Sequence, residues 1–212
     1  DNEPMLWNST HRDVHPQPLT YDEIWQRTVE YATAIKVRDP AAKVFGPVTW
    51  GYCDLFGSAA DNCLDGVDRA AHGGTPFVKW YLQQVCSYQA SHGIRLVDYL
   101  DLHYYPQGDG VVDFSDPPNG SETAAASARR LRSLKELYDP DWDSESWLSD
   151  LGNTAPWHYS RPQLLRRVRA WIDESCPGTG LAITEYNWGS DNGASSALAQ
   201  AEALAIFARE RV

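Results

Sequence analysis

The stretch Leu181-Ala-Ile-Thr-Glu-Tyr-Asn-Trp188 decides the fold and the function assigned to this chain, because residues suited to a buried strand run directly into an acid. A carboxylate at the end of a buried strand is costly unless it is paired or takes part in chemistry. Two aromatic residues, Tyr186 and Trp188, follow Glu185 closely. In parallel α/β barrels the catalytic groups stand at the carboxyl ends of the strands. The pattern therefore predicts a functional role for Glu185.

A second acid, Glu3, stands in a similar setting within Asp1-Asn-Glu-Pro4, with Trp7 shortly after it. A glycosidase needs two carboxyl groups, one as proton donor and one as nucleophile or base. Two acids among aromatic residues therefore favour a glycosidase. The competing interpretation is that each glutamate is a solvated loop residue.

Composition restricts the partners of the chain. Its 212 residues are 42% hydrophobic, which is enough for one globular domain. Nine Trp and eleven Tyr suit a sugar-binding cleft, although they suit an ordinary core as well. A net charge of -11 argues against nucleic acid as a partner, because phosphates would be repelled. The sequence has no apolar run of about 18 residues, the length that predicts a membrane-spanning helix.

The segment Thr20-Tyr-Asp-Glu23 has the pattern of a capping box, in which each side chain accepts a hydrogen bond from the other residue's backbone N–H. We expect a helix from there to about Val37 and a strand at Lys43–Val48. The helix face expected to be buried comprises Tyr21, Ile24, Thr28, Tyr31, Ala32 and Ile35.

Helices and strands alternate along the rest of the sequence. We expect helices at about 75–92 and 123–138, further helices from Pro162 and from about Ala194, and strands at 96–103 and 181–184. Basic residues of the second of these helices are expected on a solvated outer face, namely Arg129, Arg130, Arg132 and Lys135. Strands separated by helices pair in parallel through right-handed crossovers. Three strands, with one more before Asp1, make about half of an eight-stranded (β/α)8 barrel.

Residues 51–74 are expected to form a long loop. Cys53 and Cys63 both lie in it, and they would close a small disulfide if the protein is exported, with free thiols as the alternative. A structural calcium ion is possible there, although the spacing is not that of an EF-hand and a solvated loop is favoured. The acids considered for it are Asp61, Asp65 and Asp68.

The segment Tyr99-Leu-Asp-Leu-His-Tyr-Tyr-Pro106 brings further chemistry to a strand end. His103 and Tyr105 are two residues apart, so on a strand they share one face. An imidazole and a phenol beside a carboxylate can orient it and set its charge state. The alternative is that both belong to an aromatic core or rim.

Five segments in this order resemble glycoside hydrolase family 44, the endo-β-1,4-glucanases and xyloglucanases. They are Asp1-Asn-Glu-Pro-Met-Leu-Trp-Asn-Ser-Thr-His-Arg-Asp-Val-His15, Val44-Phe-Gly-Pro-Val48, Ala71-His-Gly-Gly74, Tyr99–Pro106 and Ile183-Thr-Glu-Tyr-Asn-Trp-Gly189. The resemblance covers nearly the whole chain. It implies a TIM-like (β/α)8 barrel with a β-sandwich domain, of which residues 1–212 would supply the end of strand 4 through helix 7. The N-terminal strands, strand 8 and the sandwich would be missing.

The resemblance also implies roles and partners. Glu3 would be the general acid/base and Glu185 the nucleophile of a hydrolysis that retains anomeric configuration. The complete enzyme would be a secreted monomer that cleaves β-glucan polysaccharides and requires no cofactor. Neither a nucleic acid nor a membrane would be among its partners. Residues expected to bind substrate are Asn2, Trp7, Trp50, His103, Tyr104, Tyr105, Tyr186 and Trp188. Among them Asn2 would bind the 2-hydroxyl, Tyr105 would align Glu185, and Trp50, Tyr104 and Trp188 would stack on sugar rings.

Three alternatives stay open at this point. A non-catalytic carbohydrate-binding module would keep the aromatic residues and need no acid pair. A metal-dependent hydrolase would use His11, His15, Asp13 or His103 with the acids, although prolines near the first two argue against a helix and favour solvated loop histidines. Residues 1–212 alone could also be an inactive fragment, and we expect them to fold weakly in isolation because open sheet edges would be exposed.

Overall fold

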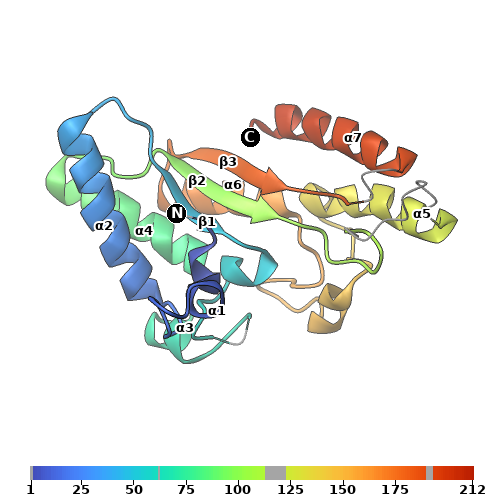
Figure 1. The fold of residues 1–212 in the computed structure, drawn as a ribbon, viewed down its shortest axis with the longest axis horizontal. Coiled ribbons are helices and arrows are strands. Elements are labelled where there is room, and N and C mark those ends of the chain that lie inside the picture. The colour runs from blue at the N-terminus through green and yellow to red at the C-terminus, as the bar shows by residue number, and fades with distance from the viewer. Residues whose placement is uncertain (1, 62, 113–122, 190–192) are drawn as a thin grey trace. The chain divides into compact units, whose positions relative to one another are not determined.

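The computed structural model describes residues 2–61, 63–112, 123–189 and 193–212 (Figure 1). Helices and strands alternate in the predicted order, so the α/β class is confirmed. The chain divides into two compact units, Asp1–Tyr104 with Val168–Glu185, and Tyr105–Arg167 with Tyr186–Val212. No helix in the described part of the chain is long and apolar enough to cross a membrane.

The first unit is built on a three-stranded sheet. Its strands are β1 (Phe45–Thr49), β2 (Tyr99–Tyr104) and β3 (Gly180–Tyr186), in the order β1-β2-β3. The predicted parallel pairing is confirmed for β1 and β2, whose register shifts between Pro47 and Thr49. The described residues form an open sheet, so the closed barrel stays a prediction.

Helix α2 (Tyr21–Arg38) begins as predicted at Thr20, whose hydroxyl accepts a hydrogen bond from the backbone N–H of Glu23 at 3.3 Å. The second half of the expected capping box differs. The carboxylate of Glu23 instead binds the ring of His15 and the guanidinium of Arg27, each at 2.8 Å. These side chains replace the backbone contact of a capping box, and the charged guanidinium of Arg27 binds a carboxylate more strongly than a backbone N–H does.

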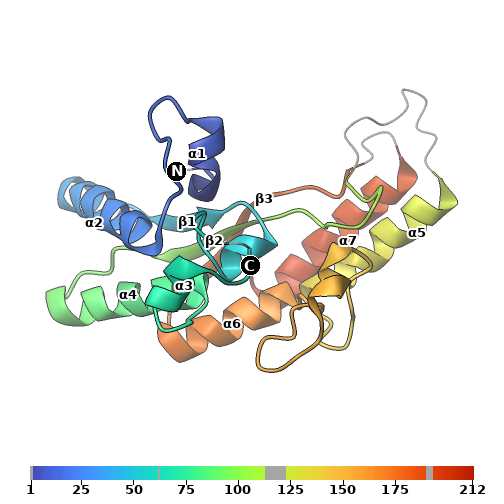
Figure 2. The ribbon, with the colours of Figure 1, turned by 90° about the horizontal axis from the view of Figure 1, so that it is seen from below.

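Two residues on the predicted buried face of α2 are exposed. Helices α2 and α4 (Phe77–His92) lie side by side (Figure 2). Tyr31 and Ile35, however, are 59% and 44% exposed. Phe45, at the start of β1, is 42% exposed. All three line a cavity of about 260 Å³ beside β1. The reason is that β1 lies at an edge of the described sheet, so α2 has no further strand to cover there.

Strand β3 is also less buried than its sequence predicts. Of the four residues expected to be buried, Leu181 is 3% exposed, whereas Thr184 is open to solvent. Strand β3 forms the other edge of the described sheet, so its apolar residues are covered incompletely. The central strand β2 carries the core instead, with Leu100 and Leu102 fully buried.

Two disulfides lie in the first unit. Cys53–Cys63 is the pair that the sequence suggested, and Cys86–Cys176 is an additional one. The second bond joins α4 to the residue after α6 (Leu164–Ser175) across 90 positions of sequence. The segment 51–74 is not a plain loop, since it contains a 3₁₀ helix, Tyr52–Leu55, and the short helix α3, Val67–Ala71.

Removing the longer disulfide is expected to destabilise the chain more than removing the shorter one. The double variant Cys86→Ala/Cys176→Ala should lose about 4.6 kcal/mol of unfolding free energy, because the unfolded chain gains freedom that grows with loop length. The matched variant Cys53→Ala/Cys63→Ala should lose about 2.5 kcal/mol by the same relation. Urea denaturation measures both, and the reverse order would contradict the expectation.

A partly buried ion pair ties α2 to the start of β2. The ammonium of Lys36 lies 2.7 Å from Oδ2 of Asp98, which also accepts the backbone N–H of Val44 at 2.9 Å. Burial alone would raise the pKa of Asp98, but the hydrogen bonds from Lys36 and Val44 outweigh it and lower that pKa. The carboxylate therefore stabilises the fold in its ionised form.

The substitution Lys36→Met is expected to cost about 2 kcal/mol of stability at pH 7, between the values for exposed and buried pairs. Because the folded-state pKa of Asp98 is depressed, its contribution is present above the unfolded pKa and is lost as the pH falls through the folded pKa. The cost should therefore shrink in acid. Lys43→Met is the control, since Lys43 lies 3.4 Å from Asp98 but is 63% exposed. Equal costs for both variants in denaturation curves would refute this account.

In the second unit, helix α5 (Ala124–Ser133) continues into a 3₁₀ helix at Leu134–Leu137 and contacts α7 (Ala194–Glu210), as Figure 2 shows. Short elements elsewhere are a 3₁₀ helix at Trp147–Leu151 and, in the first unit, α1 (Trp7–Thr10) with a 3₁₀ helix before it. The segments 107–122 and 189–193 lie partly outside the described residues.

The prediction that the basic run of α5 is a solvated face is wrong for Arg130, which is 1% exposed. Its guanidinium donates hydrogen bonds to the carbonyl oxygens of Gly110, Val111 and Trp188 and to the hydroxyl of Ser195. A buried cation is tolerated when its donors are satisfied. The run therefore contains a structural arginine that fixes the chain around Trp188.

Candidate active site

Glu3 is held by an unusual backbone at the start of the first unit. It precedes the 3₁₀ helix Pro4–Leu6, and its φ of 45° and ψ of 58° fall in the left-handed region. This conformation is uncommon for a residue other than glycine and marks places where the surroundings impose the geometry. The indole N–H of Trp7 donates to the carbonyl oxygen of Asn2 at 3.2 Å, which ties the two sides of Glu3 together.

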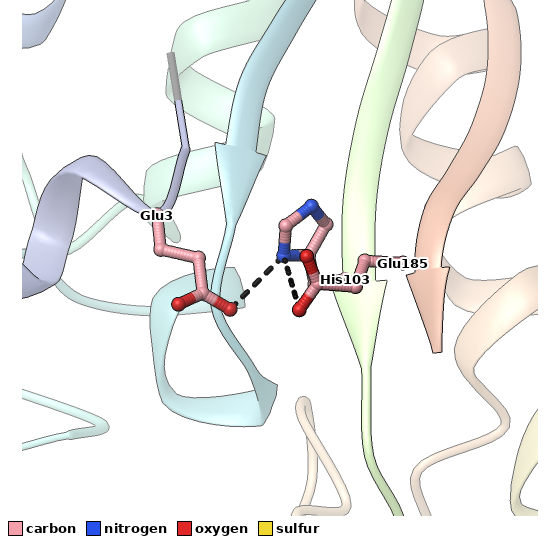
Figure 3. A group of neighbouring side chains, drawn as sticks. All are labelled: Glu3, His103 and Glu185. Carbon is pink, nitrogen blue, oxygen red and sulfur yellow. Dashed lines mark hydrogen bonds and ion pairs between the residues drawn. The ribbon is translucent and has the colours of Figure 1, made fainter. Parts of the chain in front are cut away.

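The sheet supplies two further side chains beside Glu3. His103 lies near the end of β2 and Glu185 near the end of β3, and Figure 3 shows both pointing toward Glu3. Nδ1 of His103 is 3.0 Å from Oε1 of Glu3 and 3.7 Å from Oε1 of Glu185. The His103 side chain is 2% exposed, whereas those of Glu3 and Glu185 are 20% and 43% exposed. The structure therefore brings three predicted residues into one group.

The two carboxyl groups are close enough for direct cooperation. One oxygen of each glutamate and Nδ1 of His103 all lie within 4.8 Å of one another. Retaining glycosidases place their carboxyl groups about 5 to 5.5 Å apart, and inverting ones about 6.5 to 9.5 Å apart. The oxygens of Glu3 and Glu185 that lie within 4.8 Å of each other are nearer to the retaining spacing than to the inverting one.

A buried carboxyl group that the sequence did not single out lies close to Glu3. Asp54 is 3% exposed and accepts the backbone N–H of Trp50 at 3.0 Å. Burial raises the pKa of Asp54; hydrogen bonds from Trp50 oppose this, and the charge of Glu3 adds to it. Its sequence signal was an acid followed by Leu55 and Phe56, an apolar setting that predicts burial.

Asp101 fixes the strand that carries Glu185. It is 2% exposed, and its carboxylate accepts the backbone N–H and the hydroxyl of Thr184 at 3.2 and 2.8 Å. Burial raises the pKa of Asp101, and the bonds from Thr184 and the charge of His103 oppose it. Because Thr184 directly precedes Glu185, this contact sets the position of β3 next to β2. The signal missed was an acid two residues before His103, on the same face.

Two of the predicted substrate-binding residues line a cavity. Asn2 and Trp7 border a space of about 460 Å³ whose other walls are His11, Val14, His15 and Arg27. The ring of Trp7 has Arg27 above it at 5.5 Å and His15 against it at 5.5 Å. The prediction that His15 is solvated is wrong, because its side chain is 11% exposed and paired with Glu23.

The predicted stacking residues differ in exposure. Trp50 is half-buried, but Tyr104 is 1% exposed and Trp188 is 3% exposed. The indole N–H of Trp188 donates to the hydroxyl of Ser133 at 3.1 Å, inside the second unit. A stacking platform must present a ring face, so the burial of Tyr104 and Trp188 does not favour that role, which stays a prediction. Aromatic residues at strand ends suit a core and a cleft alike, so their sequence pattern does not separate the two.

The remaining predicted residues, Tyr105 and Tyr186, are half-buried. The hydroxyl of Tyr186 accepts a hydrogen bond from the side-chain amide of Gln200 at 2.8 Å. Tyr186 also lines a cavity of about 370 Å³ in the second unit. The alignment of Glu185 by Tyr105 stays a prediction.

Within residues 2–61, 63–112, 123–189 and 193–212, the Glu3–His103–Glu185 group is the one set of side chains with metal-ligand spacing. The three loop aspartates considered for calcium do not form such a set. Asp61 instead accepts backbone N–H bonds, one of them from Asp68 at 2.9 Å. The histidines at positions 11 and 15 do not join the group either.

Comparison with known proteins gives consistent results. Residues 1–108 match the sequence profile described as glycoside hydrolase family 44. The chain is 32% identical over 212 residues to endoglucanase A of Paenibacillus lautus, covering 99% of this chain and 28% of that protein. It is 34% identical to a beta-mannanase/endoglucanase A of Caldicellulosiruptor saccharolyticus, of which it covers 16%. The chain thus spans less than a third of these relatives.

Solved structures agree with the sequence matches. CelM2, a bifunctional glucanase-xylanase from a metagenome library, superimposes with a TM-score of 0.85 at 37% identity, over 99% of this chain and 38% of that chain. A family 44 xyloglucanase of Paenibacillus polymyxa, solved with xyloglucan, gives 0.82 at 30% identity, over 100% and 39%. With the profile matching residues 1–108 of 212, the chain belongs to glycoside hydrolase family 44.

Proposed function

We propose that this chain supplies the catalytic residues of a retaining glycoside hydrolase that cleaves internal β-1,4-glucosidic bonds of cellulose, carboxymethylcellulose or xyloglucan-type polysaccharides. The observation that carries the proposal is the short spacing of Glu3 and Glu185. One carboxylate oxygen of each lies within 4.8 Å of the other, and both residues belong to the first unit. The names of the relatives, which include endoglucanases and a xyloglucanase, support the substrate class.

The mechanism is a double displacement. Glu3 gives its proton to the glycosidic oxygen while a carboxylate oxygen of Glu185 attacks the anomeric carbon, so the bond to the leaving sugar breaks and an ester to Glu185 forms. Glu3, now ionised, takes a proton from water, and the hydroxide attacks the same carbon and releases Glu185. Two inversions restore the starting configuration.

Three residues support this chemistry without reacting. His103 is the hydrogen-bonding partner of Glu3 at 3.0 Å, and its buried ring holds that carboxyl group in place. Asp101 positions Glu185 through Thr184, and Asp54 fixes the turn at Trp50. Side chains locked by such contacts keep reacting groups within the narrow limits that catalysis requires.

Substrate would bind beside Glu3. Asn2 and Trp7 border the cavity of about 460 Å³, which has the size of a subsite for a sugar unit. Asn2 would hydrogen-bond the 2-hydroxyl, and Trp7 would stack on a sugar ring. Trp50, Tyr105 and Tyr186 remain candidates for further contacts because each is half-buried rather than enclosed.

Residues 1–212 would belong to a larger catalytic domain. In this proposal they supply the end of strand 4 through helix 7 of a (β/α)8 barrel, and the exposed edges β1 and β3 pair with further strands. Two disulfides support export, because such bonds persist in oxidising compartments. The complete enzyme would act as a monomer.

The test is the configuration of the first product. A complete family 44 catalytic domain that contains residues 1–212 is incubated with xyloglucan or carboxymethylcellulose, and the new reducing end is followed by ¹H NMR. We expect the β-anomer to form first and then to equilibrate. Early α-anomer, or no cleavage by the folded domain, would overturn the proposal.

A further inference from the structure

Glu3, His103 and Glu185 have the geometry of a metal-binding site as well as that of an acid pair. The three ligand atoms lie within 4.8 Å of one another, and Nδ1 of His103 is 3.0 and 3.7 Å from the two carboxylate oxygens. Zinc binds imidazole nitrogen and carboxylate oxygen at about 2.0 to 2.2 Å, which in a tetrahedron separates ligand atoms by about 3.5 Å. Small rotations of the glutamate side chains would therefore suffice.

The residue types select among metal ions. One imidazole with two carboxylates suits zinc, copper or nickel, whereas calcium and magnesium prefer sites made of oxygen atoms alone. Three protein ligands also leave a fourth position open, as in catalytic zinc sites. The group therefore favours a divalent transition metal over the calcium or magnesium ion of a structural site.

The site is prepared in advance and open to an ion. His103 is 2% exposed on the central strand, so its ring is fixed with Nδ1 facing both acids (Figure 3). Strand β3 is held by the bonds between Thr184 and Asp101. The carboxyl groups are 20% and 43% exposed, so an ion can reach them from solvent. Rigid placement of ligands lowers the cost of binding.

We propose that Zn²⁺ or Cu²⁺ binds Glu3, His103 and Glu185 and blocks the hydrolysis proposed above. Coordination occupies an oxygen of Glu3, which then cannot deliver its proton, and an oxygen of Glu185, which then cannot attack. The binding part stands on the geometry alone. The inhibitory part rests on the proposed function.

Binding is tested on a complete catalytic domain that contains residues 1–212, after dialysis against a chelator. Titration with ZnCl₂ in a calorimeter should show one ion per chain, and CaCl₂ and MgCl₂ should show none at the same concentrations. His103→Asn should weaken zinc at least about 100-fold, since even outer-shell changes cost 10- to 100-fold. His92→Asn is the matched control, because His92 lies at the exposed end of α4 and should leave binding unchanged.

A second readout keeps the test decisive if His103→Asn folds poorly. Glu185→Gln keeps the shape of the side chain and should change the visible absorption spectrum of bound Co²⁺, which reports the ligand set. If neither His103→Asn nor Glu185→Gln changes metal binding, or if His92→Asn abolishes it, the ion binds elsewhere and the proposal is overturned.

Inhibition is tested on the complete catalytic domain. Zinc should stop hydrolysis at the concentration that saturates the binding titration, and a chelator should restore it. Zinc that binds this group without slowing hydrolysis would overturn the inhibitory part. A folded domain that never hydrolyses glucan overturns the proposed function instead, and the binding titration then still decides whether the site exists.

Discussion

Replacing Glu185 by alanine is expected to lower the turnover number of the complete catalytic domain by about 10⁵-fold, the scale seen when an enzyme loses its nucleophile. Without the carboxylate no ester to the anomeric carbon can form. Glu3 and His103 keep their contact, but Glu3 then has no nucleophile to act with. The measurement is the initial rate on xyloglucan. Glu202→Ala, on the exposed side of α7, is the control and should retain the full rate.

Azide separates loss of the nucleophile from loss of the fold. In Glu185→Ala a small anion can enter the space of the missing carboxylate and attack an activated aryl glycoside from the same side. The product should be the α-glycosyl azide, with inverted configuration, because only one displacement takes place. A β-azide from this variant would contradict the role of Glu185.

Replacing Glu3 by alanine is expected to slow hydrolysis by an amount that depends on the leaving group of the substrate. Polysaccharide hydrolysis should fall by about 10³-fold, within the range that a positioned general acid contributes. Formation of the glycosyl-enzyme from a dinitrophenyl glycoside should fall by less than about 10-fold, because that leaving group departs without a proton. Both rates are measured on the same preparation. The ratio of the loss on polysaccharide to the loss on the aryl glycoside tests the acid role of Glu3.

Comparable losses on both substrates would remove Glu3 from the acid role. Azide again serves as a check, since in Glu3→Ala it should attack the ester on Glu185 and yield the β-azide. His103→Asn is informative beside it. If His103 only positions Glu3, that variant should lower the rate on polysaccharide more than on the aryl glycoside, with the same direction as Glu3→Ala and a smaller size.

Local sequence patterns predicted the elements of this fold well, because caps and strand ends are local chemistry. Thr20 starts α2 as expected, α4 ends at His92 where a helix to about residue 92 was expected, and Glu185 lies next to Glu3. The group of three residues was predictable because parallel strands bring their carboxyl ends to one edge. Glu3 and Glu185 needed no knowledge of distant contacts to be chosen.

Burial was harder to predict, since it depends on what lies opposite each residue. Arg130 looks like a surface cation until four acceptors from other segments surround it. Tyr31 looks like a core residue until β1 proves to be an edge of the described sheet. Asp54 and Asp101 were missed for the same reason, because their partners become visible only when the chain is folded.

The disulfide between Cys86 and Cys176 has a consequence for how the protein withstands proteolysis. The bond between Cys86 and Cys176 spans the whole segment 105–167. A peptide bond cut anywhere in that segment leaves Glu3 and His103 on a fragment that ends after Cys86, and Glu185 on a fragment that begins before Cys176. The disulfide still joins the two fragments, so a nicked molecule keeps Glu3, His103 and Glu185 in one covalent piece until a reductant cleaves the bond.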